Sequence, residues 1–374
     1  MKFRVERGDL TEAVAWTARS LPARPPVPVL AGLLMDTTGS TLTLSGFDFE
    51  VAASASVEVA IAESGRALVS GRLLAEIVRS LPSAPVDIAS EGSRLVLTCS
   101  SSKFTLPTLP VDDYPALPAL PPTVGSVSSA TFAAAVAQVV VAAGRDDTLP
   151  VLTGVRIEID GDRLTLAATD RYRLAMRELA WQPAGGEVPA AALVPGRTLA
   201  DAAKALAGGG DVTIALGSGA SGETLIGFAN DTRRTTTRLL DGEYPRYRSL
   251  LPDSHQAQAE IPTAALVESV RRVSLVAQRT SPVRLSFEQG SLLLEAGNGE
   301  DAQAAETLEV SYTGDPLTIA FNPTFLLDGL GVLDAPTARL RFTDPKRPAV
   351  LTGGEVDGGG HAYSYLLMPV RLSG

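Results

Sequence analysis

The chain repeats one domain-sized pattern three times, and this repeat limits what it can fold into. Each copy has a Pro-Val segment ahead of a strand-like run, at residues 28–32, 150–154 and 282–285, so the copies are spaced by 122 and 132 residues. The period is too long for a solenoid, whose repeats run to about 20–50 residues. Each copy is long enough to bury a core of its own, which predicts three related domains. A second landmark repeats in step, at residues 67–72, 192–197 and 319–323.

The composition is that of a globular protein without export or membrane signals. With 374 residues, 45% hydrophobic and 20% charged, the chain has room for two or three domains. Its apolar runs, such as residues 132–141, are too short or too rich in Ala to cross a bilayer. The charged start, residues 1–6, does not suit a secretion signal, and the lone Cys99 cannot form an internal disulfide. These features favour a cytoplasmic protein.

Apolar periodicity and turn residues place two helices in each copy. A strand and a helix open each copy, paired strands and a second helix follow, and more strands close it, which predicts α+β domains with two helices packed on strand-rich sheets. Asp9, Ser129 or Thr131, and Thr263 are expected to cap the first helices, because their oxygens can accept the free amide hydrogens of a first turn. The first helices are expected over residues 10–20, up to residue 143, and from 264 to about 278; the second over 71–81, 196–207 and 323–333; closing strands over 94–98, 224–229 and 338–343.

Two stretches rich in proline mark the expected domain boundaries. Residues 109–122 contain five prolines, and residues 241–255 contain Pro245 and Pro252. Proline clusters of this kind are typical of linkers. The predicted domains are therefore residues 1–122, 123–254 and 255–374.

Three patterns that look like chemical sites have simpler explanations. Residues 217–222 fit G-x-G-x-x-G, but a strand-like run follows where a dinucleotide site needs a helix, so a hairpin loop is predicted. His255 and His361 stand in polar, turn-like surroundings without metal-ligand spacing or a nucleophile motif. The acid pairs at 112–113 and 146–147 are interpreted as solvated loop acids. The sequence predicts no enzyme, no metal and no cofactor.

Basic residues concentrate on or beside the predicted helices, although the formal net charge is −10. Taken alone, that charge argues against a general nucleic-acid binder, because phosphate contacts need Lys and Arg. A single helix often carries basic residues on its wet face, but three copies that all do so indicate one positive surface on an acidic body. These residues are Arg7, Arg19, Arg24, Arg72, Arg79, Arg145, Arg197, Lys204, Arg271, Arg272 and Arg279.

Five segments, in order along the chain, carry a family resemblance: residues 1–7, 168–175, 240–248, 321–328 and 365–372. Together with the threefold repeat they resemble the bacterial β sliding clamps, the beta subunit of DNA polymerase III. The resemblance covers essentially the whole chain. It implies a head-to-tail homodimer in which six domains close into a ring, with helices lining the hole and sheets outside.

The resemblance also implies a DNA sliding clamp, a processivity factor that encircles duplex DNA and slides along it. Such a ring needs only weak, sequence-independent phosphate contacts. The implied partners are double-stranded DNA, a second copy of the chain, and the replicative polymerase, clamp loader and repair proteins, which dock through short linear motifs. The DNA-facing residues by family position are Arg24, Arg72, Arg79, Arg197 and Lys204, and Arg279 is added from its place beside a predicted helix.

The family's hydrophobic peptide-binding groove can be carried over by position. Leu, Pro and Met suit a soft pocket for apolar anchors, and arginines such as Arg173 and Arg371 can hold a peptide backbone or carboxylate. From the residues alone, the core of a last strand is the better interpretation of Leu366 and Met368. The groove residues are Leu152, Thr169, Tyr172, Arg173, Leu174, Pro245, Leu250, Asn322, Phe325, Pro348, Leu366, Met368, Pro369, Val370 and Arg371.

Some positions depart from the family's usual pattern. Tyr172 stands where a His is frequent, Val370 where a second Met is frequent, and Pro348 where Ser occurs. These departures leave open whether the chain is a cell's main clamp or a specialised second copy with an altered groove. The implied dimer contact joins Leu73, Phe104 and Leu106 of one subunit to Ser274 and Leu275 of the other.

Two other classes of protein compete with the clamp. A hydrolase would need acids and histidines that converge on one site, and a three-domain surface protein would need an export signal. The sequence shows neither pattern.

Overall fold

The computed structural model describes residues 1–185, 190–219, 222, 224–277, 281–297, 302–353 and 363–371. They form two compact units. Unit 1 takes in residues 1–130, 183–185 and 201–239, and unit 2 takes in 131–182, 186–200 and 240–374. Helices α3 (Ser129–Val140) and α4 (Gly196–Leu206) and the short strand β14 (Gln182–Pro183) run from one unit into the other along the chain. The boundaries of the three predicted domains stay a prediction.

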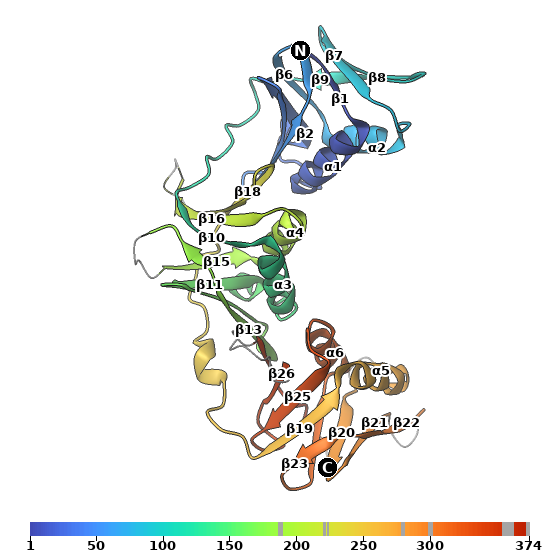
Figure 1. Cartoon of the computed structure of the whole chain (residues 1–374), viewed down its shortest axis with the longest axis vertical. Helices are drawn as coiled ribbons and strands as arrows, with labels where there is room; N and C mark the ends of the chain where they lie inside the picture. Colours follow the sequence, from blue (N-terminus) through green and yellow to red (C-terminus); the bar gives the residue numbers. More distant parts are fainter. Residues whose placement is uncertain are drawn as a thin grey trace. The chain divides into compact units, whose positions relative to one another are not determined.

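Unit 1 is an antiparallel strand ladder that carries two complete helices and the second half of α4 (Figure 1). Its hydrogen-bonded strand order is β10-β16-β17-β18-β4-β3-β2-β6-β9-β8-β7-β1-β5. The strands are β1 (Lys2–Val5), β2 (Gly32–Thr38), β3 (Thr41–Phe47), β4 (Val51–Glu58), β5 (Ala60–Glu63), β6 (Gly65–Ser70), β7 (Val86–Glu91), β8 (Arg94–Cys99), β9 (Ser102–Leu109), β10 (Thr123–Ser128), β16 (Asp211–Ser218), β17 (Thr224–Ala229) and β18 (Arg233–Arg238).

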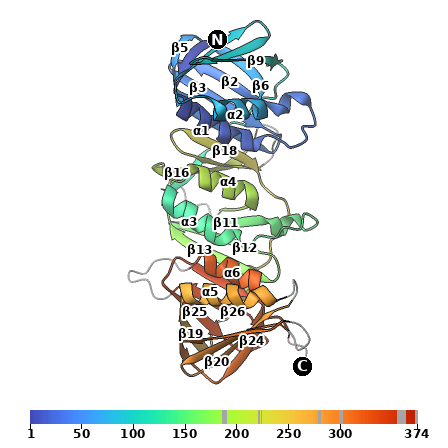
Figure 2. The ribbon, with the colours of Figure 1, turned by 90° about the vertical axis from the view of Figure 1, so that its right-hand side faces the viewer.

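Helices α1 (Arg7–Thr17) and α2 (Gly71–Ser80) lie side by side on one face of unit 1 (Figure 2). Their apolar sides enter a core that contains Leu10, Val14 and Leu74 together with strand residues such as Leu42 and Leu95. Alternate residues of β1, Phe3 and Val5, join the same core, as expected for a strand with one wet face. The polar sides of both helices are left on the surface of the unit.

Unit 2 contains two antiparallel sheets. The larger has the order β15-β11-β12-β13-β27-β26-β25-β19-β23, and the smaller has the order β22-β21-β20-β24. The strands are β11 (Gly154–Asp160), β12 (Arg163–Thr169), β13 (Arg173–Ala180), β15 (Ala190–Pro195), β19 (Ala257–Pro262), β20 (Val283–Glu288), β21 (Ser291–Ala296), β22 (Ala304–Glu309), β23 (Ser311–Thr313), β24 (Leu317–Phe321), β25 (Thr337–Phe342), β26 (Ala349–Gly353) and β27 (Tyr363–Leu367).

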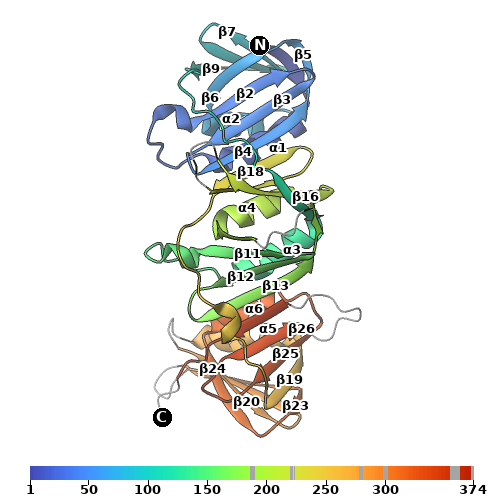
Figure 3. The ribbon, with the colours of Figure 1, turned by 90° about the vertical axis from the view of Figure 1, so that its left-hand side faces the viewer.

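The larger sheet joins segments that are far apart in the sequence (Figure 3). Strand β13 pairs with β27 near the end of the described chain, with Arg173 opposite Leu367 and Leu174 opposite Leu366. One ladder therefore connects the central part of the chain to its last strand, and this junction positions the candidate site.

Helices α5 (Thr263–Val273) and α6 (Pro323–Gly331) pack together beside this sheet (Figure 2). Asn322 caps α6, because its side-chain oxygen accepts the backbone N–H groups of Thr324 and Phe325. Pro323 follows at the first helical position, where a missing N–H has no cost. Five short 3₁₀ turns complete the described structure: Ala18–Ser20, Pro28–Ala31, Pro150–Thr153, Tyr247–Leu250 and Ser274–Val276.

The predicted α+β organisation is confirmed, and several end points are corrected. Asp9 does not cap α1, which begins at Arg7, so Asp9 lies in its first turn. Thr263 is the first residue of α5 and donates its hydroxyl to the carbonyl of Ala335 instead of capping. The helices that were expected to reach residues 20 and 143 end at Thr17 and Val140. The helix that was expected from residue 264 to about 278 begins at Thr263 and already ends at Val273.

Candidate peptide-binding pocket and candidate DNA-facing residues

The floor of the candidate pocket lies where β13 meets β27. Leu174 and Leu366 are opposite each other in this pairing and are 0% and 2% exposed. They form a small buried cluster with Ala167 and Tyr247. Because the ladder fixes the register, these two leucines are held side by side from positions that the sequence separates widely.

A cavity of about 250 Å³ opens above this floor. Its walls come from the strand ends, the 3₁₀ turn at Pro150–Thr153 and the segment around Pro245. Two apolar side chains at its rim are strongly exposed, Leu250 at 49% and Met368 at 41%. The cavity gathers nine of the predicted groove residues and adds Arg171: Leu152, Thr169, Arg171, Arg173, Leu174, Pro245, Leu250, Pro348, Leu366 and Met368.

Arg173 is a buried organiser of this pocket. It is only 4% exposed, and its guanidinium contacts carboxylates on two elements, Asp170 at 2.9 Å and Asp328 of α6 at 2.6 Å. It also donates to the hydroxyl of Tyr365 at 3.4 Å and lies 4.3 Å from the centre of the Phe325 ring. With its charge already balanced, Arg173 ties β13 to α6 and β27, so its part in any peptide binding is to shape the pocket.

The pKa of Arg173 follows from these contacts. Burial by itself lowers the pKa of the guanidinium, but Tyr365 and the hydrogen bond to Asp328 more than offset it, so the pKa is raised above its ordinary value. The phenol of Tyr365 has its pKa raised, mainly by burial, and donates to the backbone carbonyl of Phe325 at 2.7 Å. Both groups therefore keep one protonation state at neutral pH.

A tight turn ahead of β13 presents two exposed side chains. The carboxylate of Asp170 accepts the N–H groups of Tyr172 and Arg173, both at 3.1 Å, and this turn places Arg171 at a φ of 80°. Tyr172 is 55% exposed and stacks on Phe325 with ring centres 6.2 Å apart. Its carbonyl accepts the N–H of Met368 at 2.9 Å. The turn therefore holds the end of β27 against the pocket.

The segment that supplies Pro245 and Leu250 is fastened to the outer strands. The hydroxyl of Tyr247 donates to Glu158 at 2.8 Å, and Arg248 donates to the same carboxylate at 3.0 Å and to Glu178 at 3.4 Å. Burial raises the pKa of Glu158, but hydrogen bonds from Arg248 and Tyr247 outweigh it, so the pKa of this carboxyl lies below its ordinary value. Glu158 is therefore ionised at neutral pH, as this fastening requires.

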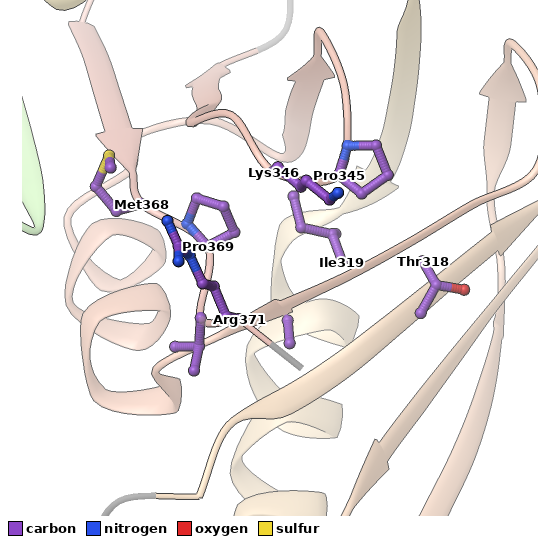
Figure 4. A pocket seen from close by; sticks show the side chains of 9 residues that line it. Thr318, Ile319, Pro345, Lys346, Met368, Pro369 and Arg371 are labelled. Atoms are coloured by element: carbon purple, nitrogen blue, oxygen red, sulfur yellow. The ribbon is translucent and has the colours of Figure 1, made fainter. Parts of the chain in front are cut away.

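The remaining groove residues belong to the start of α6 or to the segment that follows Met368. Asn322 and Phe325 belong to the start of α6, where Asn322 acts as the cap and Phe325 lies against Arg173. Pro369, Val370 and Arg371 line a second cavity, which Met368 also borders (Figure 4). Tyr172 and Phe325 line a third cavity, which shares Leu152, Arg171 and Arg173 with the apolar pocket. The predicted groove thus extends over the apolar pocket and two neighbouring cavities.

The family is identified by comparison with known proteins. Three family models match consecutive parts of the chain: the N-terminal domain of the DNA polymerase III beta subunit at residues 1–118, its central domain at 126–246 and its C-terminal domain at 248–371. The chain belongs to the DNA polymerase III beta subunit family. These proteins are the bacterial beta sliding clamps.

Relatives and solved structures agree over the full length. The chain is 58% identical to the beta sliding clamp of Streptomyces coelicolor and 45% identical to the beta sliding clamp homolog GriR of Streptomyces muensis, and each match covers 100% of both chains. The fold matches a crystal structure of the Pseudomonas aeruginosa sliding clamp bound to griselimycin with a TM-score of 0.92, at 29% identity and 100% coverage of both chains. Family membership makes this chain a sliding clamp of DNA replication and a non-catalytic processivity factor, with DNA, polymerase and a second copy as its classes of partner.

In this sliding clamp, the cations carried over as DNA-facing lie on the protein surface wherever the structure describes them. Arg24, Arg72, Arg79 and Lys204 are all exposed. Arg72 of α2 donates to the carbonyls of Pro22 at 3.2 Å and Ala23 at 3.1 Å, which brings it beside the segment that carries Arg24. Among the described residues none of these four cations makes an ion pair, so their positive charge is uncompensated. Arg197 of α4 is also exposed, and Arg279 lies outside the described residues.

The residues that the family resemblance implies for the dimer contact lie partly on the surface and partly in the core. Leu73 is 43% exposed and Leu275 is 84% exposed, so both offer apolar surface. Phe104 and Ser274 are half-buried. Leu106 is 2% exposed and belongs to the core of unit 1, so its side chain is not part of the surface.

The patterns that look chemical form no common site among the residues that the structure describes. Strands β16 and β17 pair across the glycine-rich stretch, which confirms that a strand and not a helix follows it. His255 and the acid pairs at 112–113 and 146–147 are exposed, and His361 lies outside the described residues. The part of the chain that the structure describes holds no cluster of three potential metal ligands and no helix long and apolar enough to cross a membrane.

Several residues of the pocket are not among those predicted from the sequence. Arg171, Asp328 and Tyr365 belong to it or to its supporting network, as do Tyr247 and Glu158. All except Glu158 lie inside the segments that carry the family resemblance, and this position in the sequence could have identified them as part of the site. Glu158 has no local signal, since only the fold brings it to the 3₁₀ turn at Tyr247–Leu250.

Proposed function

We propose that this chain forms a head-to-tail homodimeric ring that encircles duplex DNA in the cytoplasm and slides along it. In this proposal the three domains of each subunit cover residues 1–122, 123–254 and 255–374. The threefold repeat and the full-length family match support a closed ring, since a heterologous contact closes when its rotation permits. Exposed Leu73 and Leu275 are the apolar residues of the subunit contact.

The proposed DNA contacts are electrostatic and independent of sequence. Arg24, Arg72, Arg79, Arg197 and Lys204 are exposed in a chain whose formal net charge is −10. Phosphate contacts by such cations fix no base sequence, which suits a protein that must move along DNA. The acidic remainder of the chain discourages binding elsewhere on its surface.

The pocket above Leu174 and Leu366 is proposed to receive short linear motifs of partner proteins. The single observation that carries this proposal is the apolar cavity of about 250 Å³ with exposed Leu250 and Met368 at its rim. Apolar anchors that enter such a preformed pocket supply most of the affinity of an interface. The replicative polymerase, clamp loader and repair proteins are the proposed owners of these motifs.

The comparisons favour a general clamp over a specialised second copy. The identity of 58% to the Streptomyces coelicolor beta sliding clamp exceeds the 45% to the homolog GriR. Pro348 lines the apolar pocket, Val370 the cavity beside it and Tyr172 the third cavity, so each can alter the fit of a partner. We therefore assign to these three positions a role in ranking partners.

A reciprocal pair of variants tests the pocket. Met368→Ala should weaken binding of a peptide with Leu and Phe anchors by about 1–3 kcal/mol, the usual cost of truncating an interface anchor, and should leave the dimer intact. Leu275→Ala should weaken the dimer and leave the peptide affinity unchanged. Isothermal titration calorimetry and sedimentation velocity measure the two effects. Equal peptide affinity for wild type and Met368→Ala would place the partner site elsewhere.

A further inference from the structure

The backbone frame of the candidate pocket occurs a second time, inside unit 1, where β4 pairs with β18. A tight turn precedes β4, in which the carboxylate of Asp48 accepts the N–H groups of Glu50 at 2.9 Å and Val51 at 2.6 Å. Asp170 holds the turn ahead of β13 through the equivalent two hydrogen bonds. In both turns the residue after the aspartate has a positive φ, which is 76° at Phe49. The two turns are therefore copies of one structure.

The strand paired beside this turn is held in the same way in both places. The carbonyl of Glu50 accepts the N–H of Arg238 at 3.1 Å at the end of β18, and the carbonyl of Tyr172 accepts the N–H of Met368 at 2.9 Å after β27. A 3₁₀ turn precedes β2 in unit 1 and β11 in unit 2. Unit 1 therefore contains the frame of the pocket, as expected for a chain that repeats one domain pattern.

The row of side chains across this part of the sheet is much smaller in unit 1. Ala52 of β4 lies opposite Thr236 of β18, which lies opposite Gly227 of β17. The matching positions of β13 and β27 are Leu174 and Leu366, the floor of the candidate pocket. Opposite residues of an antiparallel pair share one face of the sheet. The small row therefore leaves space above the sheet of unit 1.

A segment of the chain itself fills this space. It is the linker between β9 and β10, residues 110–122 (teal in Figure 1). Leu120 lies directly on the small row, because a Cβ at Gly227 would overlap its Cδ1 atom. Tyr114 is buried in an apolar cluster with Ala52, and Leu117 packs against the same cluster. The linker therefore covers the row with the side chains of Tyr114, Leu117 and Leu120.

The linker of unit 2 has the same sequence pattern but leaves its site open. Both linkers contain Tyr-Pro, at residues 114–115 and 244–245, and both have a leucine six residues after the tyrosine. In unit 1 this is Leu120, which is half-buried on the sheet, and in unit 2 it is Leu250, which is 49% exposed at the rim of the cavity. A floor as bulky as Leu174 and Leu366 offers Leu250 no comparable position on the sheet.

We propose that the surface around Ala52, Thr236 and Gly227 is a second peptide-binding site, and that residues 114–121 are its tethered ligand. The class of ligand is an extended apolar segment with a leucine anchor and prolines, which restrict the free chain and so reduce the entropy lost on binding. This inference rests on the proposed function of the first pocket, because it is the frame of that pocket that recurs.

Tethering keeps the second site closed to partner proteins. A short linker holds its ligand at an effective concentration on the order of millimolar, so a free peptide at micromolar concentration displaces little of it. Each subunit then presents one open pocket, although it contains two frames.

Leu120→Ala removes the anchor and should let a free peptide enter the second site. Titration calorimetry with a peptide that carries Leu and Phe anchors should find one bound peptide per wild-type subunit and two per Leu120→Ala subunit. Hydrogen exchange should locate the additional peptide, through slower exchange of residues 225–238 in this variant only. Ala119→Gly is the matched control, because Ala119 is an exposed neighbour in the same linker, and it should keep a single bound peptide.

Gly227→Ala tests the same contact from the side of the sheet. The added methyl group takes the position of the flexible end of the Leu120 side chain, so the variant should fold while the amides of residues 116–120 exchange faster than in wild type. Combined with Leu120→Ala, it should abolish binding of the second peptide. Unchanged exchange of the linker in Gly227→Ala, or a single bound peptide in Leu120→Ala, overturns this inference. Wild type that binds no peptide contradicts instead the proposed function of the first pocket.

Discussion

Arg173 in unit 2 and Arg72 in unit 1 show two opposite uses of the same side chain. Arg173 is 4% exposed, and two carboxylates, a tyrosine hydroxyl and an aromatic ring surround its guanidinium. Arg72 is exposed and donates to two backbone carbonyls, without an acid in contact among the described residues. The charge of Arg173 is paired inside the protein and stabilises the fold, whereas the charge of Arg72 stays free to attract a ligand.

The difference follows from the cost of burial. A buried charge destabilises a protein unless paired groups replace its water, so Arg173 persists only because Asp170, Asp328 and Tyr365 surround it. An exposed arginine has no such requirement, and an acid beside it would cancel the field that attracts phosphate. Internal ion pairs therefore hold the pocket in shape. The exposed cations Arg24, Arg72 and Arg79 can attract phosphate only because no acid in the described part of the chain is paired with them.

Removing Arg173 should have the largest effect of the changes considered. Arg173→Ala leaves Asp328 and Asp170 without their buried partner, and breaking a buried pair in this way costs about 3–5 kcal/mol. Arg72→Ala should change the free energy of unfolding by less than about 0.5 kcal/mol, as is usual for a surface position. Urea denaturation of both variants measures the contrast. Similar, small losses in both would show that the Arg173 network is not what holds β13 against α6.

Local patterns in the sequence were enough to predict most of the fold. Apolar alternation and turn residues predicted strands such as β17 correctly, because strand faces are set by neighbours a few residues away. Helix starts were less predictable. Asp9 looked like a cap, yet the helix begins earlier, at Arg7, and leaves Asp9 inside its first turn.

The candidate pocket could be predicted only in part. Family position gave its lining, including Met368, which residues alone could have assigned to a core strand; the structure buries Leu366 but leaves Met368 41% exposed. The role of Arg173 could not be predicted from the sequence, because Asp328 is 155 residues away. Only the pairing of β13 with β27, against which α6 packs, brings Asp328 close to Arg173. Ion-pair networks between distant segments have no local signature.

If the exposed cations Arg24, Arg72 and Arg79 contact phosphates, the affinity for DNA should fall as the salt concentration rises. Each phosphate contact contributes about 0.9 to the slope of log affinity against log salt concentration. Replacing Arg24, Arg72 and Arg79 together by Ala should therefore make DNA binding weaker and lower that slope by up to about 2.7 per subunit. Arg272→Ala is the matched control, since Arg272 is exposed but already paired with Glu268 and Glu306.

Fluorescence anisotropy with duplex DNA over a range of salt concentrations provides this measurement. The control should keep the wild-type slope, because its charge is not free to neutralise a phosphate. A triple variant with an unchanged slope would mean that these three cations do not contact DNA. A slope lowered equally by Arg272→Ala would mean that internal pairing does not decide which arginines act on DNA.

The smallest expected effect concerns the exposed pair that serves as this control. Hydrogen bonds from Arg272 and Ser269 lower the pKa of Glu306 from 4.5 to about 2. A carboxyl whose pKa is lower in the folded state stabilises the fold above its unfolded pKa, and this contribution disappears as the pH falls from about 4.5 through about 2. Because water surrounds the pair, the contribution should be far smaller than that of Arg173.

Glu306→Gln isolates this contribution. The variant should be slightly less stable than wild type at pH 7, and the difference should shrink as the pH falls through about 2 and vanish below it, where Glu306 of wild type is protonated too. NMR titration of the Glu306 carboxyl, followed beside urea denaturation at each pH, links the two observations. If Glu306 titrates near 4.5 instead, Arg272 is not held by this carboxylate in solution. Arg272 would then be as free as Arg72, and the salt experiment would need Arg347, which pairs with Asp344, as its control.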